Sequence, residues 1–242
     1  MFVGRELLAL ARAGGATSIA VVGTAKNVGK TVTVGAIGAA LDAEGMTFGL
    51  ASSGRDGEAV DVIEATPKPR FHLRAGTILA TVDALLPRSA ATQMLEATGE
   101  RGALGPIVIV RVLEEGFFEV AGPSTAAAMR RVVERLAARV PFVLIDGAID
   151  RIASLRDGNE AIVVAVGAAF PTLEQVIEDL RRFLARLSAV RRERPLRPIA
   201  CTVAPRGPEG AFAPAAFLAA VAAATGLPTY DVYAGEASCS SP

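Results

Sequence analysis

The run Gly23-Thr24-Ala25-Lys26-Asn27-Val28-Gly29-Lys30-Thr31 has the glycines, lysine and threonine of a loop that binds phosphate. It follows directly on 18–22, a short apolar run whose β-branched residues predict a buried strand. A helix is expected over 31–44, where Gly45 ends it. Because the backbone N–H groups of such a loop and the first turn of such a helix form a nest for anions, the run predicts a nucleoside triphosphate site.

The residues of this loop have distinct expected roles. The Lys30 ammonium is expected to reach the β- and γ-phosphates, and the Thr31 hydroxyl to bind Mg²⁺. The first glycine is displaced, because Gly23 lies six residues before Gly29 and Thr24 stands where the glycine is usual. The alternative is a glycine-rich turn without a ligand, but strand, glycine, Lys-Thr and helix follow in the order of a nucleotide site. The expected nucleotide contacts are Gly23, Thr24, Ala25, Lys26, Asn27, Val28, Gly29, Lys30, Thr31 and Val32.

Lysine is scarce in this chain. Of its 25 basic side chains only Lys26, Lys30 and Lys68 are lysines. Because a compact ammonium and a planar guanidinium are not equivalent against phosphate oxygens, the two lysines in the loop are expected to be functional, and Lys68 is a weaker candidate.

A carboxylate follows another apolar strand. The run 142–145 predicts a buried strand that ends at Asp146, the position from which an aspartate holds Mg²⁺ through water beside a phosphate loop. We expect Asp146 and Thr31 to share the metal, and Asp146 and Lys30 to be catalytic. Asp150 and Arg151 are further candidates beside the γ-phosphate, with a solvated turn as the alternative.

Polar residues also follow the strand expected over 47–52. Arg55, Asp56 and Glu58 come just after it, and open parallel sheets bind ligands at the carboxyl ends of their strands. Asp56 is a candidate catalytic residue and second metal-side carboxylate, and Arg55 a candidate phosphate or substrate ligand. A solvated loop is the alternative for this cluster.

The rest of the chain predicts one α/β domain over 1–242, with an N-terminal helix or extension over 1–17 and a flexible tail over 234–242. The order of strand, loop, helix and strand is a βαβ unit, so we expect a doubly wound, mostly parallel sheet flanked by helices, with a small β-hairpin insertion. Further strands are expected over 161–166, 198–203 and 229–233, and further helices over 124–139, 172–189 and 214–225.

The middle of the chain is less regular. A strand pair broken at Ala75-Gly76 is expected over 71–81, and a helix over 90–98. The runs 107–112 and 117–120 flank Glu114-Glu115-Gly116 and are expected to form a hairpin.

Composition narrows the function classes. The formal net charge is zero, so nothing steers the chain towards nucleic acid or an anionic membrane. The arginine-rich run 181–197 follows acidic residues and is expected to be a solvated helix face. Two cysteines are too few for a disulfide framework or metal cluster, and His72 is expected to be structural. With no signal peptide or membrane span in the sequence, a cytoplasmic protein is expected.

The loop resembles those of dethiobiotin synthetases and of the glutamine-dependent cobyrinic acid amidating enzymes. Both belong to the MinD-like and signal-recognition-like class of P-loop proteins, which implies a P-loop NTPase fold, ATP or GTP with Mg²⁺, and often a homodimer. Many members carry an extra lysine early in the loop that reaches a nucleotide across the dimer. The resemblance implies a similar part for Lys26, although its offset from Lys30 departs from the usual pattern. The sequence contains no Asn/Thr-Lys-x-Asp motif that reads guanine, which favours ATP.

Five runs together resemble one narrower family: 23–31, 53–58, 66–69, 121–124 and 146–151. They are similar to KamB, the small P-loop subunit found with adenosylcobalamin-dependent lysine 5,6-aminomutase, over residues 18 to about 155. The resemblance implies a reactivase that acts with an ATPase partner or on the aminomutase itself. Two alternatives stay open: a ligase of the dethiobiotin synthetase type that acts on a small carboxylate, and a nucleotide-sensing module.

Overall fold

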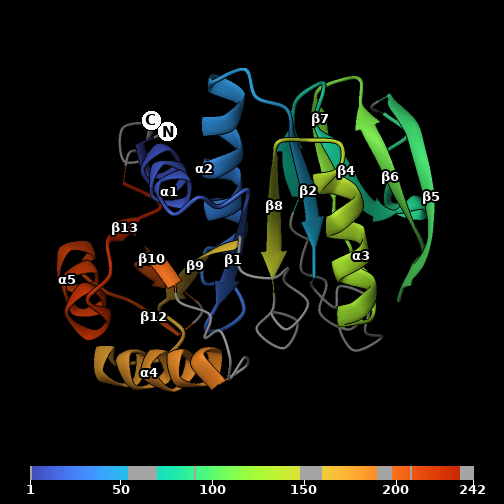
Figure 1. The fold of residues 1–242 in the computed structure, drawn as a ribbon. Coiled ribbons are helices and arrows are strands. Elements are labelled where there is room, and N and C mark those ends of the chain that lie inside the picture. Colours follow the sequence, from blue (N-terminus) through green and yellow to red (C-terminus); the bar gives the residue numbers. More distant parts are fainter. Residues whose placement is uncertain are drawn as a thin grey trace, which may run out of the picture.

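A mostly parallel sheet forms the centre of the computed structural model, which describes residues 2–53, 70–89, 91–147, 160–189, 198–207 and 209–234 (Figure 1). Within these residues the sheet has nine strands in the order β13-β10-β9-β1-β8-β2-β4-β6-β5. All neighbours from β13 to β4 are parallel, whereas β6 and β5 continue the sheet antiparallel. The strands are β1 (Ser18–Gly23), β2 (Phe48–Ser52), β4 (Ile78–Val82), β5 (Thr92–Gly102), β6 (Gly105–Val112), β8 (Phe142–Gly147), β9 (Glu160–Gly167), β10 (Pro198–Ala204) and β13 (Thr229–Asp231).

Helices cover both faces of this sheet, which confirms the predicted fold class. Helices α1 (Phe2–Ala13) and α2 (Lys30–Ala43) lie on one face, together with a two-stranded sheet of β3 (Arg70–Leu73) and β7 (Gly116–Glu119). Helices α3 (Ala126–Ala137), α4 (Leu173–Ala189) and α5 (Pro214–Thr225) cover the other face. The short elements are the 3₁₀ helix η1 (Asp83–Leu85) and the strand pair β11 (Arg206–Gly207) and β12 (Gly210–Ala211). No helix in the described ranges is long and apolar enough to cross a membrane.

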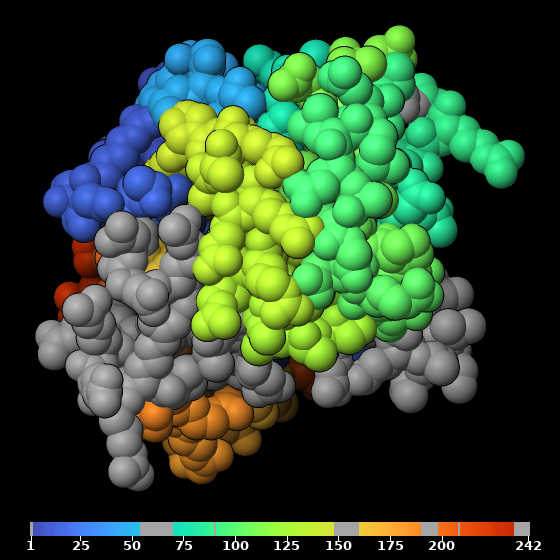
Figure 2. Space-filling view, turned by 45° about the vertical axis from the view of Figure 1, so that its right-hand side comes forward, coloured from blue at the N-terminus to red at the C-terminus, as the bar shows by residue number. Residues whose placement is uncertain are grey.

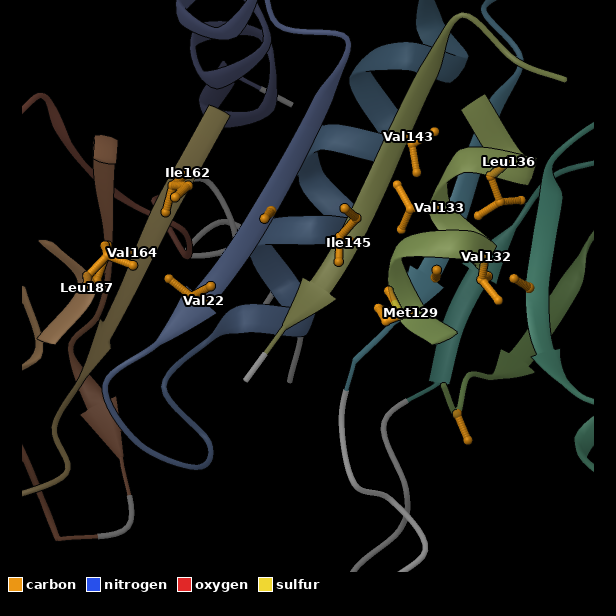
Figure 3. Close-up of a cluster of buried hydrophobic side chains, with 14 of the residues drawn as sticks. Val22, Met129, Val132, Val133, Leu136, Val143, Ile145, Ile162, Val164 and Leu187 are labelled. Atoms are coloured by element: carbon orange, nitrogen blue, oxygen red, sulfur yellow. The ribbon is translucent and has the colours of Figure 1, made fainter. Parts of the chain in front are cut away.

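The core forms two layers because side chains alternate along each strand. In β8, Val143 and Ile145 join the cluster under α3, while Phe142 and Leu144 join the cluster under α2. Figure 3 shows the first of these layers, in which α3 side chains lie beside those of β8. The α3 residues labelled there are Met129, Val132, Val133 and Leu136.

The helix expected over 90–98 is wrong, because this stretch belongs to the edge strand β5. The helix-favouring residues are overridden by pairing with β6, which is interrupted by two register shifts. The Thr98 hydroxyl donates to the carbonyl of Ile107 at 2.7 Å, and Glu96 pairs with Arg135 of α3 at 2.9 Å. The surface view shows α3 in yellow-green against the green β5–β6 region (Figure 2).

The expected hairpin of 107–112 with 117–120 is also wrong. Strand β6 pairs with β4 and β5, whereas β7 pairs with β3 in a separate sheet. The antiparallel hairpin is instead formed by β5 and β6. The pair expected over 71–81 contains two strands, β3 and β4, which belong to different sheets. The helix expected over 124–139 begins two residues later, at Ala126, after its N-cap Thr125, whose side chain accepts from Ala128 N.

Candidate functional site

The loop between β1 and α2 is anchored to the sheet at its start and in its middle. Thr24 N donates to the carbonyl of Ala165 in β9 at 3.1 Å. Val28 is 1% exposed and lies against Gly167, where a Cβ would come 2.7 Å from the Val28 Cα. On either side of Val28 the backbone is left-handed, at Asn27 with φ 57° and at Gly29 with φ 91°. Such alternation aims successive N–H groups at one point, which is how a loop of this kind binds phosphate.

Lys30 folds back across the start of its own loop. Its Nζ donates to the Ala25 carbonyl at 3.1 Å, and its stem passes over Gly23. A Cβ at Gly23 would lie 2.9 Å from both Cγ and Cδ of Lys30 and 2.7 Å from Cγ2 of Val28. Glycine at this position therefore makes room for the lysine, so the displaced glycine of the sequence has a structural purpose in this loop. Any larger side chain at this position would fill the cradle.

Asp146 lies at the carboxyl end of β8, the strand next to β1. It is 8% exposed, and its register partners are Val21 in β1 and Ser52 in β2. Its carbonyl accepts from Ser53 N at 2.7 Å. The alternation that places Leu144 under α2 places Asp146 on the same face, where α2 begins with Lys30 and Thr31. The structure thus brings together, at one edge of the sheet, a lysine, a hydroxyl and a buried carboxylate.

The segment between β7 and α3 crosses this edge of the sheet and contains the run 121–124. After β7 the chain passes from the α2 face to the α3 face, and at Gly122 it touches the end of β2. A Cβ at Gly122 would lie 1.6 Å from the Ser52 carbonyl oxygen. On its other side, a Cβ at Gly102 would lie 2.6 Å from the Gly122 carbonyl oxygen. At Gly122 the segment between β7 and α3 therefore packs its backbone against the backbone of Ser52, the register partner of Asp146.

A buried threonine fixes the start of this crossing. Thr81 is 0% exposed, its hydroxyl donates to the Glu119 carbonyl at 3.1 Å, and it accepts from Ala121 N at 3.1 Å. The signal available in the sequence was the small, turn-forming run 121–124, which points to a close approach but does not say to what.

Six of the predicted site residues lie outside the described residues. They are Arg55, Asp56, Glu58, Lys68, Asp150 and Arg151. The described chain reaches Ser53 and Gly147, both beside Asp146. His72 lies 3.3 Å from Glu115 and makes an edge contact with the Phe117 ring, as suits a structural role. Within the described part of the chain, no three His, Cys, Asp or Glu side chains are grouped to hold a metal.

The Cys201 thiol is expected to be inert. It is 0% exposed, and burial raises its pKa to about 11, so roughly one thiol in a thousand ionises at pH 8. In a Cys239→Ser background, Ellman's reagent at pH 8 should leave native protein unmodified and label one thiol in guanidinium. The reciprocal Cys201→Ser variant reports the other thiol. Rapid labelling of Cys201 in native protein would show that β10 opens readily.

No family model and no curated protein matches the chain. A DUF1611 family protein from Anabaena variabilis is 17% identical, with 94% of this chain and 57% of that chain covered and a TM-score of 0.46. The signal recognition particle receptor FtsY from Elizabethkingia anophelis is 12% identical, with 83% of this chain and 56% of that chain covered and a TM-score of 0.38. The BceF tyrosine kinase domain is 16% identical, with 76% of this chain and 71% of that chain covered and a TM-score of 0.41.

The chain thus spans 57% and 56% of the lengths of the first two structures. The strand order of the chain itself defines its fold. A parallel sheet carries the glycine-rich loop between β1 and α2, and the strand that ends in Asp146 lies next to β1. This arrangement is a doubly wound α/β fold, with the glycine-rich loop at the carboxyl end of β1.

Proposed function

We propose that this chain binds and hydrolyses a nucleoside triphosphate, ATP, with Mg²⁺. The observation that carries the proposal is the loop cradle, in which Lys30 lies across Gly23 and the backbone alternates in handedness up to Gly29. A lysine held over a loop of backbone N–H groups at a helix N-terminus is suited to the β- and γ-phosphates. The residues of this loop therefore fit a nucleoside triphosphate.

Each residue of the cradle has a definite task in this proposal. Lys30 exchanges its hydrogen bond to the Ala25 carbonyl for phosphate oxygens. The Thr31 hydroxyl and, through water, the Asp146 carboxylate hold Mg²⁺. Bound Mg²⁺ neutralises charge on the phosphate oxygens. Asp56 is proposed as the further carboxylate that orients the attacking water.

Nucleotide binding can be tested by thermal shift. Saturation at about 100 times Kd stabilises a protein by about 2.7 kcal/mol, which for a chain of this size raises Tm by roughly 5–11 °C. We expect this rise with Mg·ATP and its loss in Lys30→Ala. Arg181→Ala, on the exposed side of α4, also removes one positive charge and should keep the rise. An unchanged Tm of the wild type at millimolar Mg·ATP would contradict the proposal.

We further propose that the chain serves as the reactivase-type subunit of an adenosylcobalamin-dependent amino acid aminomutase. Its support is the resemblance of 23–31, 53–58, 66–69, 121–124 and 146–151 to the KamB family. Hydrolysis would then stabilise one of two conformations that the partner distinguishes. We expect slow turnover by the chain alone and a rate raised by the aminomutase or its ATPase partner. A rate that instead requires a small carboxylic acid would support a ligase of the dethiobiotin synthetase type.

A further inference from the structure

Two buried threonines meet beside the last residue of the loop cradle. Thr33, in the first turn of α2, and Thr202, in β10, are 0% and 1% exposed, and their hydroxyl oxygens are 2.9 Å apart. The Thr33 hydroxyl also donates to the Gly29 carbonyl at 2.9 Å. Because its single proton goes to that carbonyl, Thr202 is the donor in the hydroxyl pair. A chain of hydrogen bonds therefore runs from β10 through Thr33 to Gly29.

The residue beside Thr202 in the neighbouring strand holds the other end of the loop. Thr202 is the register partner of Ala165 in β9, and the Ala165 carbonyl accepts from Thr24 N. Two neighbouring residues, Ala165 and Thr202, thus hold the two ends of the loop. Ala165 bonds to Thr24, and Thr202 bonds through Thr33 to Gly29. The loop between them contains the left-handed residue Asn27, a conformation that costs free energy in a non-glycine residue and needs support from its surroundings.

Helix geometry alone does not require these hydroxyls. Thr33 N already donates to the Gly29 carbonyl at 2.9 Å, which is the ordinary first hydrogen bond of α2. Valine has nearly the volume of threonine and avoids the desolvation of a hydroxyl in the core. Two mutually satisfied hydroxyls in an apolar layer point to a need for a fixed geometry at this place.

We propose that Thr33 and Thr202 are positioning residues for the phosphate loop, which they hold in its binding conformation before the nucleotide arrives. This inference rests on the proposed function. Neither side chain contacts the phosphates; both act through Gly29. If the pair is lost, the loop samples other conformations, and the apparent Kd rises in inverse proportion to the remaining competent fraction.

A double-mutant cycle tests the proposal. Affinity for Mg·ATP is measured by isothermal titration calorimetry at a temperature where circular dichroism shows every variant folded. Thr33→Val, which removes both hydroxyl bonds, should weaken binding about tenfold, the equivalent of about 1.4 kcal/mol. Thr202→Val should weaken it less, because the bond from Thr33 to Gly29 remains. The double variant should bind no more weakly than Thr33→Val, since the two changes break one chain of bonds. Thr33→Ser, which keeps the hydroxyl, should bind like the wild type.

The control is Thr98→Val. Thr98 is also buried, and its hydroxyl donates to Ile107, but four strands separate β5 from β1. This variant should melt earlier and bind Mg·ATP with unchanged affinity. If Thr33→Val behaves in the same way, or if the two valine substitutions add, the positioning role is overturned. A wild-type protein without affinity for Mg·ATP would overturn the proposed function as well.

Discussion

Asp146→Asn should lower nucleotide turnover by about 100-fold or more while Mg·ATP binding stays measurable. Asn keeps the shape of the side chain and removes the charge that we propose for the water-mediated hold on Mg²⁺. Loss of one preorganised electrostatic partner costs on the order of 10²–10³ in turnover at comparable sites. Binding should survive because Lys30 and the loop backbone supply the contacts to the phosphates. The measurements are steady-state phosphate release and Mg·ATP affinity on the same preparations.

The matched control is Asp179→Asn on α4, which makes the same chemical change away from the loop. It should leave both turnover and affinity unchanged. If Asp146→Asn hydrolyses ATP at the wild-type rate, Asp146 has no part in the metal site. If it loses Mg·ATP binding altogether, the Asp146 carboxylate is needed for nucleotide binding itself. The proposal that Lys30 and the loop backbone suffice for binding is then wrong.

Gly122→Ala should lower the free energy of unfolding by about 3 kcal/mol or more, because backbone packs on both sides of this residue. The new Cβ would lie 1.6 Å from the Ser52 carbonyl oxygen, so the end of β2 or the crossing itself must move. For a chain of this length the expected fall in Tm is roughly 6–12 °C or more. Because Ser53 N donates to the Asp146 carbonyl, the shift should also weaken the Mg·ATP-induced rise in Tm.

Gly35→Ala is the control for glycine replacement as such. Gly35 lies in α2, and a Cβ there would meet nothing within 4 Å. Alanine has the higher helix propensity, so this variant should be as stable as the wild type or more stable, by up to about 1 kcal/mol. If Gly122→Ala melts within a degree or two of the wild type, the backbone around Gly122 can move away from Ser52 at little cost in stability.

Much of the fold could be predicted from the sequence because the relevant signals are local. The apolar run before Gly23, the loop and the helix after it are neighbours in the chain, and so are the β8 strand and Asp146. Their periodicities match the observed elements to within one or two residues. The two lysines and the two glycines at 23 and 29 marked the loop without any knowledge of distant contacts.

The antiparallel part could not be predicted in this way. The residues of β5 favour a helix locally, and only the open edge of β6 and the arginines of α3 make them a strand. The partners of β6 and β7 were likewise wrong, since neither strand carries a signal that names its neighbour. Contacts between residues far apart in the chain depend on the whole topology.

By itself, therefore, the sequence determined the glycine-rich loop between β1 and α2, the carboxylate at the end of β8 and the parallel α/β class, because each depends on residues adjacent in the chain. Only the tertiary structure decided why glycine stands at position 23, what Gly122 touches and which threonine supports Thr33. In each of these cases the deciding atom comes from a residue brought close by folding: the Lys30 stem folded back over its own loop, the Ser52 carbonyl and the Thr202 hydroxyl.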